Sequence, residues 1–169
     1  MNNPQIVEKG EITLVGMVFY GRPFKDAEGW TGENEIGKLW QRFITFMEAK
    51  GDLLKNVVDS NVGYEVYIEP DEYPETKNIY VMVGVEVDEV EDLPLEMFVK
   101  VLPPSTYAVF TLKGEEITSN WHETYEEWLS NSDYREGGKF MFEYYDERFK
   151  GLDNIAESEI DVYFPIIGR

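Results

Sequence analysis

The chain has no cysteine and only one histidine. The missing cysteines exclude disulfides, thiolate metal ligands and a cysteine nucleophile. With His122 alone, a zinc site built on several histidines is excluded, and Ser-His-Asp catalysis would depend on that one residue. A phosphate-cradling glycine loop is also missing, since Gly137-Gly138 is typical of a tight turn. We therefore expect neither a metal site nor a cofactor.

Positive charge is scarce as well. The chain carries 15 Lys and Arg against 34 Asp and Glu, which gives a net charge of −19. Such a chain cannot neutralise phosphates, so we expect no direct nucleic-acid binding and a preference for cationic partners. The longest uncharged apolar run, residues 79–85, is too short to cross a bilayer. Residues 1–4 show no secretion signal, so the cytoplasm is the expected compartment, without a membrane partner.

What the sequence does contain is one order of elements that occurs twice. Each half shows a β-rich run, then apolar residues at helical spacing, then two further strand-like runs. In the first half the helical stripe runs from Ile36 to Met47 with a stop at Gly51, and the last two strands are expected to pair antiparallel. The predicted elements are strand 12–19, helix 36–47 and strands 62–69 and 79–87, then strand 107–112, helix 117–129 and strands 140–145 and 160–164.

The two repeats, about residues 11–88 and 104–167, are expected to form a single α+β domain over residues 1–169. The joining segment 88–104 is too short and too apolar for a flexible linker. The first repeat also holds a glycine-rich loop, residues 21–34, around Trp30. This loop is either a lid over a pocket or a surface excursion with Trp30 packed on the core.

Several predicted strands are apolar on both faces, and aromatic residues make up 15% of the chain. Two helices cannot cover both faces of eight strands, so one sheet face is expected to curve over an apolar, aromatic space suited to a small molecule. The simpler alternative is that the aromatic residues of the helical stripes, Trp40, Trp121, Tyr125 and Trp128, are core.

Glu143 is the residue that this pattern singles out. It lies in the middle of a strand, between Phe142 and Tyr144. Such a carboxylate is either at a solvated edge or inside an aromatic cavity. Inside a cavity it must be paired, protonated or available to a cation, because an unpaired buried charge costs several kcal/mol.

The order of motifs resembles the GyrI-like small-molecule-binding domain, the effector-binding module of multidrug-responsive transcription activators, here in a stand-alone form. The resemblance covers about residues 11–167. It rests on the segments 39–43, 62–64, 80–87, 105–114, 121–132, 142–145 and 160–166.

The resemblance implies two strand–helix–strand–strand (SHS2) modules with pseudo-twofold symmetry, an antiparallel curved sheet and a central groove. It also implies that the glutamate at position 143 lies at the pocket floor and attracts cationic aromatic ligands. Relatives in transcription factors carry a helix-turn-helix segment before this domain. Only about ten residues precede the first predicted strand here, so a DNA-binding domain is not expected.

We therefore predict a non-catalytic module that senses or sequesters lipophilic cationic aromatic compounds, with Glu143 as counter-charge. Glu143→Gln is expected to weaken cation binding and to leave the stability intact or improved. Which faces the rings take depends on strand register. The candidate pocket walls are Tyr64, Tyr80, Trp40, Tyr107 and Tyr163.

Two other functions fit the same sequence. A hydrolase would use Glu143 as general base and a tyrosine as hydrogen-bond donor to the developing oxyanion. An interaction protein would use the acidic surface against a basic partner such as DNA gyrase, or pass a binding signal to a regulator. The natural ligand and the oligomeric state stay open.

Overall fold

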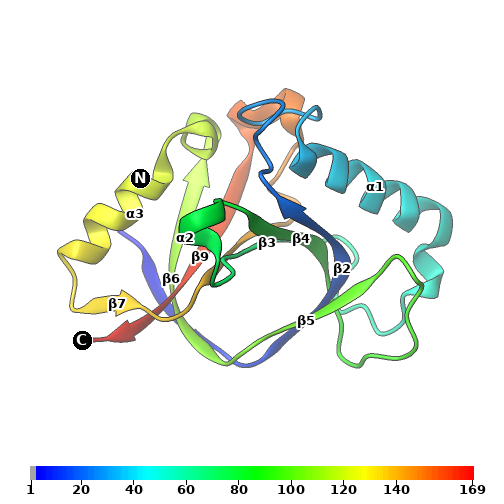
Figure 1. Cartoon of the computed structure of the whole chain (residues 1–169), viewed down its shortest axis with the longest axis horizontal. Helices are drawn as coiled ribbons and strands as arrows, with labels where there is room; N and C mark the ends of the chain where they lie inside the picture. The colour runs from blue at the N-terminus through cyan, green and yellow to red at the C-terminus, as the bar shows by residue number, and fades with distance from the viewer. Residues whose placement is uncertain (1–2) are drawn as a thin grey trace.

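The computed structural model describes residues 3–169. Met1 and Asn2, on which part of the expectation about the amino terminus rests, lie outside the described residues. The architecture is α+β, as predicted, with nine antiparallel strands in one unclosed sheet (Figure 1). The strands are β1 (Gln5–Lys9), β2 (Ile12–Gly21), β3 (Gly63–Ile68), β4 (Ile79–Glu86), β5 (Phe98–Leu102), β6 (Ser105–Lys113), β7 (Tyr134–Glu136), β8 (Phe140–Tyr145) and β9 (Glu159–Gly168).

The described chain has fewer helices than strands. Two are long, α1 (Glu35–Lys50) and α3 (Trp121–Ser130), and α2 (Tyr73–Thr76) is a single turn. Three short 3-10 helices complete the set: η1 (Gly51–Leu53), η2 (Gly114–Thr118) and η3 (Leu152–Glu157). The first predicted helix is confirmed, with Gly51 at its carboxyl end. The second is divided into η2 and α3, because Ser119 adopts an extended backbone conformation between them.

The strand order places the two halves symmetrically. It runs β1-β6-β9-β8-β3-β4-β2-β5, and β7 also pairs with β9. The third element of each half, β3 or β8, therefore lies at the centre, with the other strands of its half beside it. The predicted antiparallel pairing of β3 with β4 is confirmed. Each outer strand pairs with the opposite half, β1 with β6 and β5 with β2.

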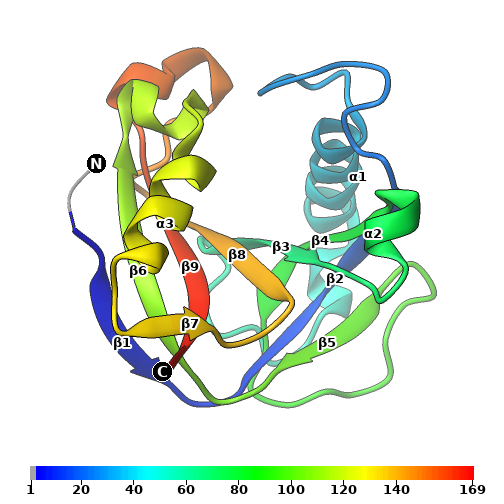
Figure 2. The same cartoon turned by 60° about the vertical axis from the view of Figure 1, so that its left-hand side comes forward.

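The two long helices lie on one face of the sheet, on either side of the β3–β8 pair (Figure 2). The helix α1 packs Leu39 and Phe43 against Val81 and Val83 of β4. On the other side, Tyr125 of α3 packs with residues of β6 and β9. Neither helix covers the middle of the sheet.

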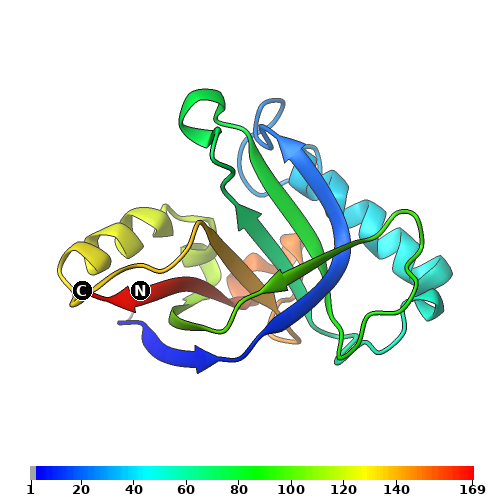
Figure 3. The same cartoon turned by 60° about the horizontal axis from the view of Figure 1, so that its bottom comes forward.

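The opposite face of the sheet carries a core to which both halves contribute. Leu14, Val66 and Met82 from the first half pack with Tyr107 and Phe142 from the second, and all five are at most 1% exposed. Figure 3 shows this strongly curved sheet with β1 and β5 toward the viewer. Leu102 of β5 and Val7 of β1 join the same core.

Candidate ligand-binding site

A cavity of about 1140 Å³ lies over the β3–β8 pair. Its walls come from both halves of the chain: the loop before α1, α1 itself, the start of α3, and the segment after β8. Eight aromatic side chains line it, and they are Phe24, Trp30, Trp40, Phe43, Tyr67, Trp121, Tyr145 and Phe149. The sequence-based expectation of an aromatic space over one sheet face agrees with this cavity.

Two carboxyl side chains lie at the floor of the cavity. Glu65 of β3 and Glu143 of β8 stand directly opposite each other across the central strand pair. They are 4% and 1% exposed. Residues that are opposed in an antiparallel pair have Cα atoms about 4.5–5.5 Å apart, so the two carboxyl groups are immediate neighbours.

Neutral donors hold both carboxyl groups in place. Trp40 Nε1 donates to Glu65 Oε1 over 2.6 Å, and the Tyr67 hydroxyl donates to Glu65 Oε2 over 2.6 Å. The Tyr145 hydroxyl donates to Glu143 Oε2. Each tyrosine follows its glutamate by two positions, so alternation along the strand puts both side chains on the same face.

Burial decides the protonation of this pair. Desolvation raises the pKa of Glu143 well above its ordinary value, and the charge of Glu65 and a hydrogen bond with it act in the same direction. Burial also raises the pKa of Tyr67 and Tyr145 well above the ordinary value, and the nearby carboxylates add to this. The tyrosines thus remain hydrogen-bond donors, and the protonated form of Glu143 is favoured beside Glu65.

No basic side chain of the described chain lines the cavity. Among residues 3–169, the lining contains five acidic residues and no Lys, Arg or His, so these residues supply no counter-charge there. The acidic members are Glu28, Glu48, Glu65, Glu143 and Asp146.

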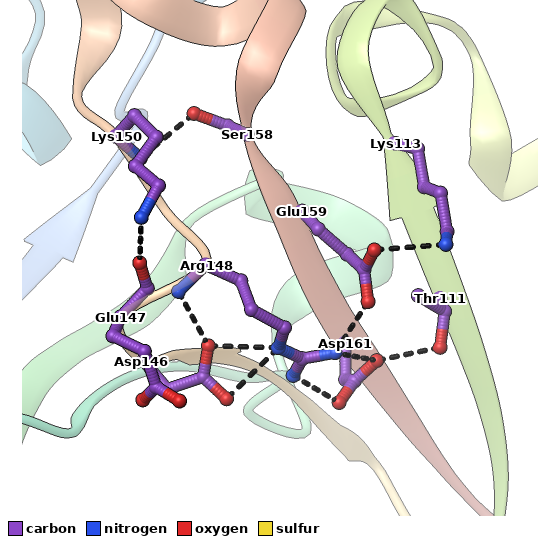
Figure 4. A network of polar contacts seen from close by, with 9 residues as sticks. All are labelled: Thr111, Lys113, Asp146, Glu147, Arg148, Lys150, Ser158, Glu159 and Asp161. Carbon is purple, nitrogen blue, oxygen red and sulfur yellow. Dashed lines mark hydrogen bonds and ion pairs between the residues drawn. The ribbon is translucent and has the colours of Figure 1, made fainter.

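One of these acids is held by an ion network beside the cavity. Arg148 contacts Asp146 over 2.8 Å, and it reaches Glu159 and Asp161 of β9 over 2.6 Å each (Figure 4). Burial opposes ionisation of Asp146, but the hydrogen bonds and charge of Arg148 hold the pKa of that carboxyl below its ordinary value. The network fixes the end of β8 to β9.

Trp30 closes the cavity from the loop before α1. Its ring centroid lies 6.4 Å from that of Tyr145 and 6.4 Å from that of Phe149, both in the second half. Buried Asn34 holds the loop, because its Nδ2 donates to the Gly29 carbonyl over 2.7 Å and its Oδ1 accepts from the Gly37 amide over 2.9 Å. Of the two alternatives for this loop, the structure places Trp30 in the cavity wall.

Two of the six predicted site residues line this cavity, Glu143 and Trp40. The other four do not. Tyr80 is 38% exposed and packs on Tyr20, with ring centroids 4.6 Å apart. The remaining three lie in the core on the opposite face of the sheet: Tyr64, Tyr107 and Tyr163.

Strand alternation explains this correction. Tyr64 directly precedes Glu65, so its side chain points to the other face, where its hydroxyl donates to Glu86 over 3.0 Å. Tyr107 and Tyr163 flank Phe142 on that same face, with ring centroids 5.5 and 4.5 Å from it. These three tyrosines stabilise the core and do not contact the cavity.

Sequence reasoning missed Glu65, the second carboxyl of the floor. A signal for it was present, since Glu65-Val66-Tyr67 and Glu143-Tyr144-Tyr145 share the pattern Glu-x-Tyr at the same place in the two repeats. The aromatic wall residue Phe149 carries no comparable signal, because it lies in a loop, whereas the glycine-rich loop around Trp30 did indicate a possible lid.

Residues 3–169 contain neither a candidate metal site nor a membrane-spanning helix. No group of three or more metal-ligating side chains is found among them. None of their helices is long and apolar enough to cross a membrane.

Comparison with known proteins connects this geometry to a family. The model of the integron-associated effector binding protein family, Cass2, matches residues 5–166. The chain belongs to this family. The resemblance to GyrI-like effector-binding domains is thereby confirmed, since Cass2 proteins and the structural neighbours share this domain.

One relative of the chain is a transcriptional regulator. The chain is 33% identical over 165 residues to the transcriptional regulator BrlR of Pseudomonas aeruginosa. The match covers 96% of this chain and 54% of the regulator. The chain thus spans about half the length of that relative.

Two solved structures share the fold. The structure of SAV2435 bound to tetraphenylphosphonium has a TM-score of 0.71 at 20% identity, and the match covers 99% of this chain and 95% of that one. An integron cassette protein of Vibrio cholerae has a TM-score of 0.61 at 17% identity, with 98% and 97% covered.

Proposed function

We propose that this protein binds lipophilic aromatic cations in the cavity over the β3–β8 pair. The observation that carries the proposal is the buried pair Glu65 and Glu143, surrounded by aromatic rings and, within the described residues 3–169, by no basic side chain. A charge in such a place needs a partner, and a ligand is the available source.

The cavity walls add affinity for the same class of ligand. A cation gains about 0.5–2 kcal/mol from each aromatic face that it contacts, and more when it is desolvated. The volume of about 1140 Å³ exceeds the 300–1,000 Å³ range typical of ligand pockets, so a bulky cation has room. The neighbour bound to tetraphenylphosphonium supports this choice of ligand class.

Drug sensing or sequestration is the role that follows from such binding. Family membership supports effector binding, and the similarity to BrlR supports a link to transcriptional regulation. This chain spans about half of that regulator. We propose that it binds the effector, and that DNA is bound by a different segment or by a partner protein.

The test is a titration with tetraphenylphosphonium, followed by tryptophan fluorescence and by calorimetry, with neutral triphenylphosphine oxide as the comparison ligand. Wild type should bind the cation and not the neutral compound. The double variant Glu65→Gln and Glu143→Gln should lose about 30-fold or more in affinity, since it removes both carboxyl groups.

A matched control removes the same two charges elsewhere. Glu123→Gln with Glu127→Gln changes two exposed residues of α3 and should bind like wild type. Two results would contradict the proposal. One is that all three proteins bind the cation with equal affinity, and the other is that wild type binds the neutral compound as tightly as the cation.

Because Glu65 lies beside Glu143, the single substitution Glu143→Gln does not remove all negative charge from the floor of the cavity. Glu143→Gln leaves the Glu65 carboxylate in the cavity, so we expect a smaller loss of cation affinity than in the double variant.

The same samples address the hydrolase alternative, because mass spectrometry after long incubation with a panel of ester and amide compounds would show accumulated product. We expect the ligands to be recovered unchanged.

A further inference from the structure

We propose that the Glu65–Glu143 pair adjusts its own charge to that of the ligand: it binds monocations with its shared proton retained, and compact aromatic dications with release of that proton. This inference rests on the proposed function and names a second ligand class for the same site.

The geometry gives each of the two carboxyl groups a hydrogen-bond donor of its own. They are opposed residues of the two central strands, each buried, and each has its own tyrosine donor two positions further along its strand. Either group can therefore carry negative charge with a donor already in place. Two such neighbours cannot both ionise cheaply without a cation between or above them.

Other groups facing the pair do not exchange protons near neutral pH. From β3 and β8 these are Tyr67 and Tyr145, whose pKa values are raised well above the ordinary range. From α1 it is Trp40, which does not titrate. Asp146 at the end of β8 is held ionised by Arg148.

The remaining acids of the lining, Glu28 and Glu48, are exposed. The described lining contains no histidine. The Glu65–Glu143 pair is thus the place where ligand charge and protonation are coupled.

A desolvated site favours zero net charge, which fixes the stoichiometry. A pair with one proton has a charge of −1 and neutralises a monocation. A dication needs a charge of −2, so one carboxyl O–H bond breaks and the proton leaves to solvent. By linkage, dication affinity then rises about tenfold per pH unit while Glu143 is protonated in the free protein, and monocation affinity stays nearly level.

The test compares diquat, a planar aromatic dication, with singly N-methylated bipyridine, a monocation of similar shape. Titration calorimetry at about pH 7 in two buffers of different ionisation enthalpy counts the protons released. We expect about one for diquat and about zero for the monocation. As long as Glu143 is protonated in the free protein, the ratio of dication to monocation affinity should rise with pH, by up to about tenfold per pH unit.

Glu143→Gln provides the internal check, because its neutral amide has no proton to release. In this variant the affinity ratio should be independent of pH, and diquat should release no proton. The exposed variant Glu123→Gln should behave like wild type.

The outcomes separate this inference from the proposed function. Cation binding that requires the pair, but with no proton release on diquat binding, would overturn the inference and leave the proposed function standing. A pH-dependent ratio that persists in Glu143→Gln would overturn it too. Failure of wild type to bind tetraphenylphosphonium and both bipyridine cations would overturn the proposed function itself.

Discussion

At the scale of single residues, Glu143 connects ligand binding to stability. Its pKa is raised on folding, so the folded protein holds a proton that the unfolded chain releases above the ordinary value of 4.5. The contribution of Glu143 to the free energy of unfolding should therefore be largest below that value and decrease as the pH rises toward the pKa of the folded state. Glu143 therefore stabilises the ligand-free protein least at high pH, which is where dications are expected to bind most tightly.

Glu143→Gln should remove part of this pH dependence. The amide resembles the protonated carboxyl in shape, so we expect little change in Tm near pH 4 and a gain of about 2–4 °C or more near pH 8, equivalent to about 1 kcal/mol. Thermal unfolding followed by circular dichroism measures this. The exposed Glu123→Gln should show no such trend, and a Glu143→Gln protein less stable than wild type at pH 8 would contradict the argument.

The sequence allowed Glu143 to be predicted and not Glu65, for a physical reason. A charge between Phe142 and Tyr144 conflicts with an otherwise aromatic strand, so it calls for an explanation. Glu65 lies between Tyr64 and Val66 in an ordinary alternation of apolar and polar positions, which is typical of a solvated strand face. Only the register of β3 against β8 places it beside Glu143.

At the scale of elements, the loop before α1 is positioned by the helix that follows it. Asn34 is the N-cap of α1 and also holds the Gly29 carbonyl, next to Trp30. Asn34→Ala should remove both contacts, lower the free energy of unfolding by about 1–3 kcal/mol and weaken binding of tetraphenylphosphonium. Urea unfolding and ligand titration measure the two effects.

A second substitution separates these two roles. Asn34→Asp keeps the oxygen that caps α1 and adds a charge that the helix amino terminus favours, but it loses the donor to Gly29. We expect nearly normal stability with weakened binding. Binding that stays at the wild-type level in both variants would show that Trp30 needs no such anchor.

Two of the strands that sequence reasoning missed share one property. Strands β1 and β5 are five residues each, and each pairs with the opposite half of the chain. Short segments of this kind have little strand signal of their own, because strand preference depends on the neighbours against which a strand packs. The segment 88–104 was therefore predicted as a connection only, although it contains β5.

At the scale of the whole molecule, this exchange of outer strands makes the two repeats interdependent. Each repeat's first strand, β2 or β6, is completed by a strand that precedes the other repeat. The core on the face away from the helices contains Leu14, Tyr64 and Met82 from one half and Tyr107 and Phe142 from the other. Neither half can bury these side chains alone.

We therefore expect the chain to unfold as one cooperative unit, as the prediction of a single domain requires. Scanning calorimetry should show one transition, with a calorimetric enthalpy about equal to the van't Hoff enthalpy. Fragments 1–91 and 92–169, separated within the exposed segment between β4 and β5, should be unfolded alone and gain structure on mixing, because mixing restores the β1–β6 and β5–β2 pairs and the shared core. Two resolved transitions, or a folded isolated fragment, would instead show that each strand–helix–strand–strand repeat is an autonomous domain.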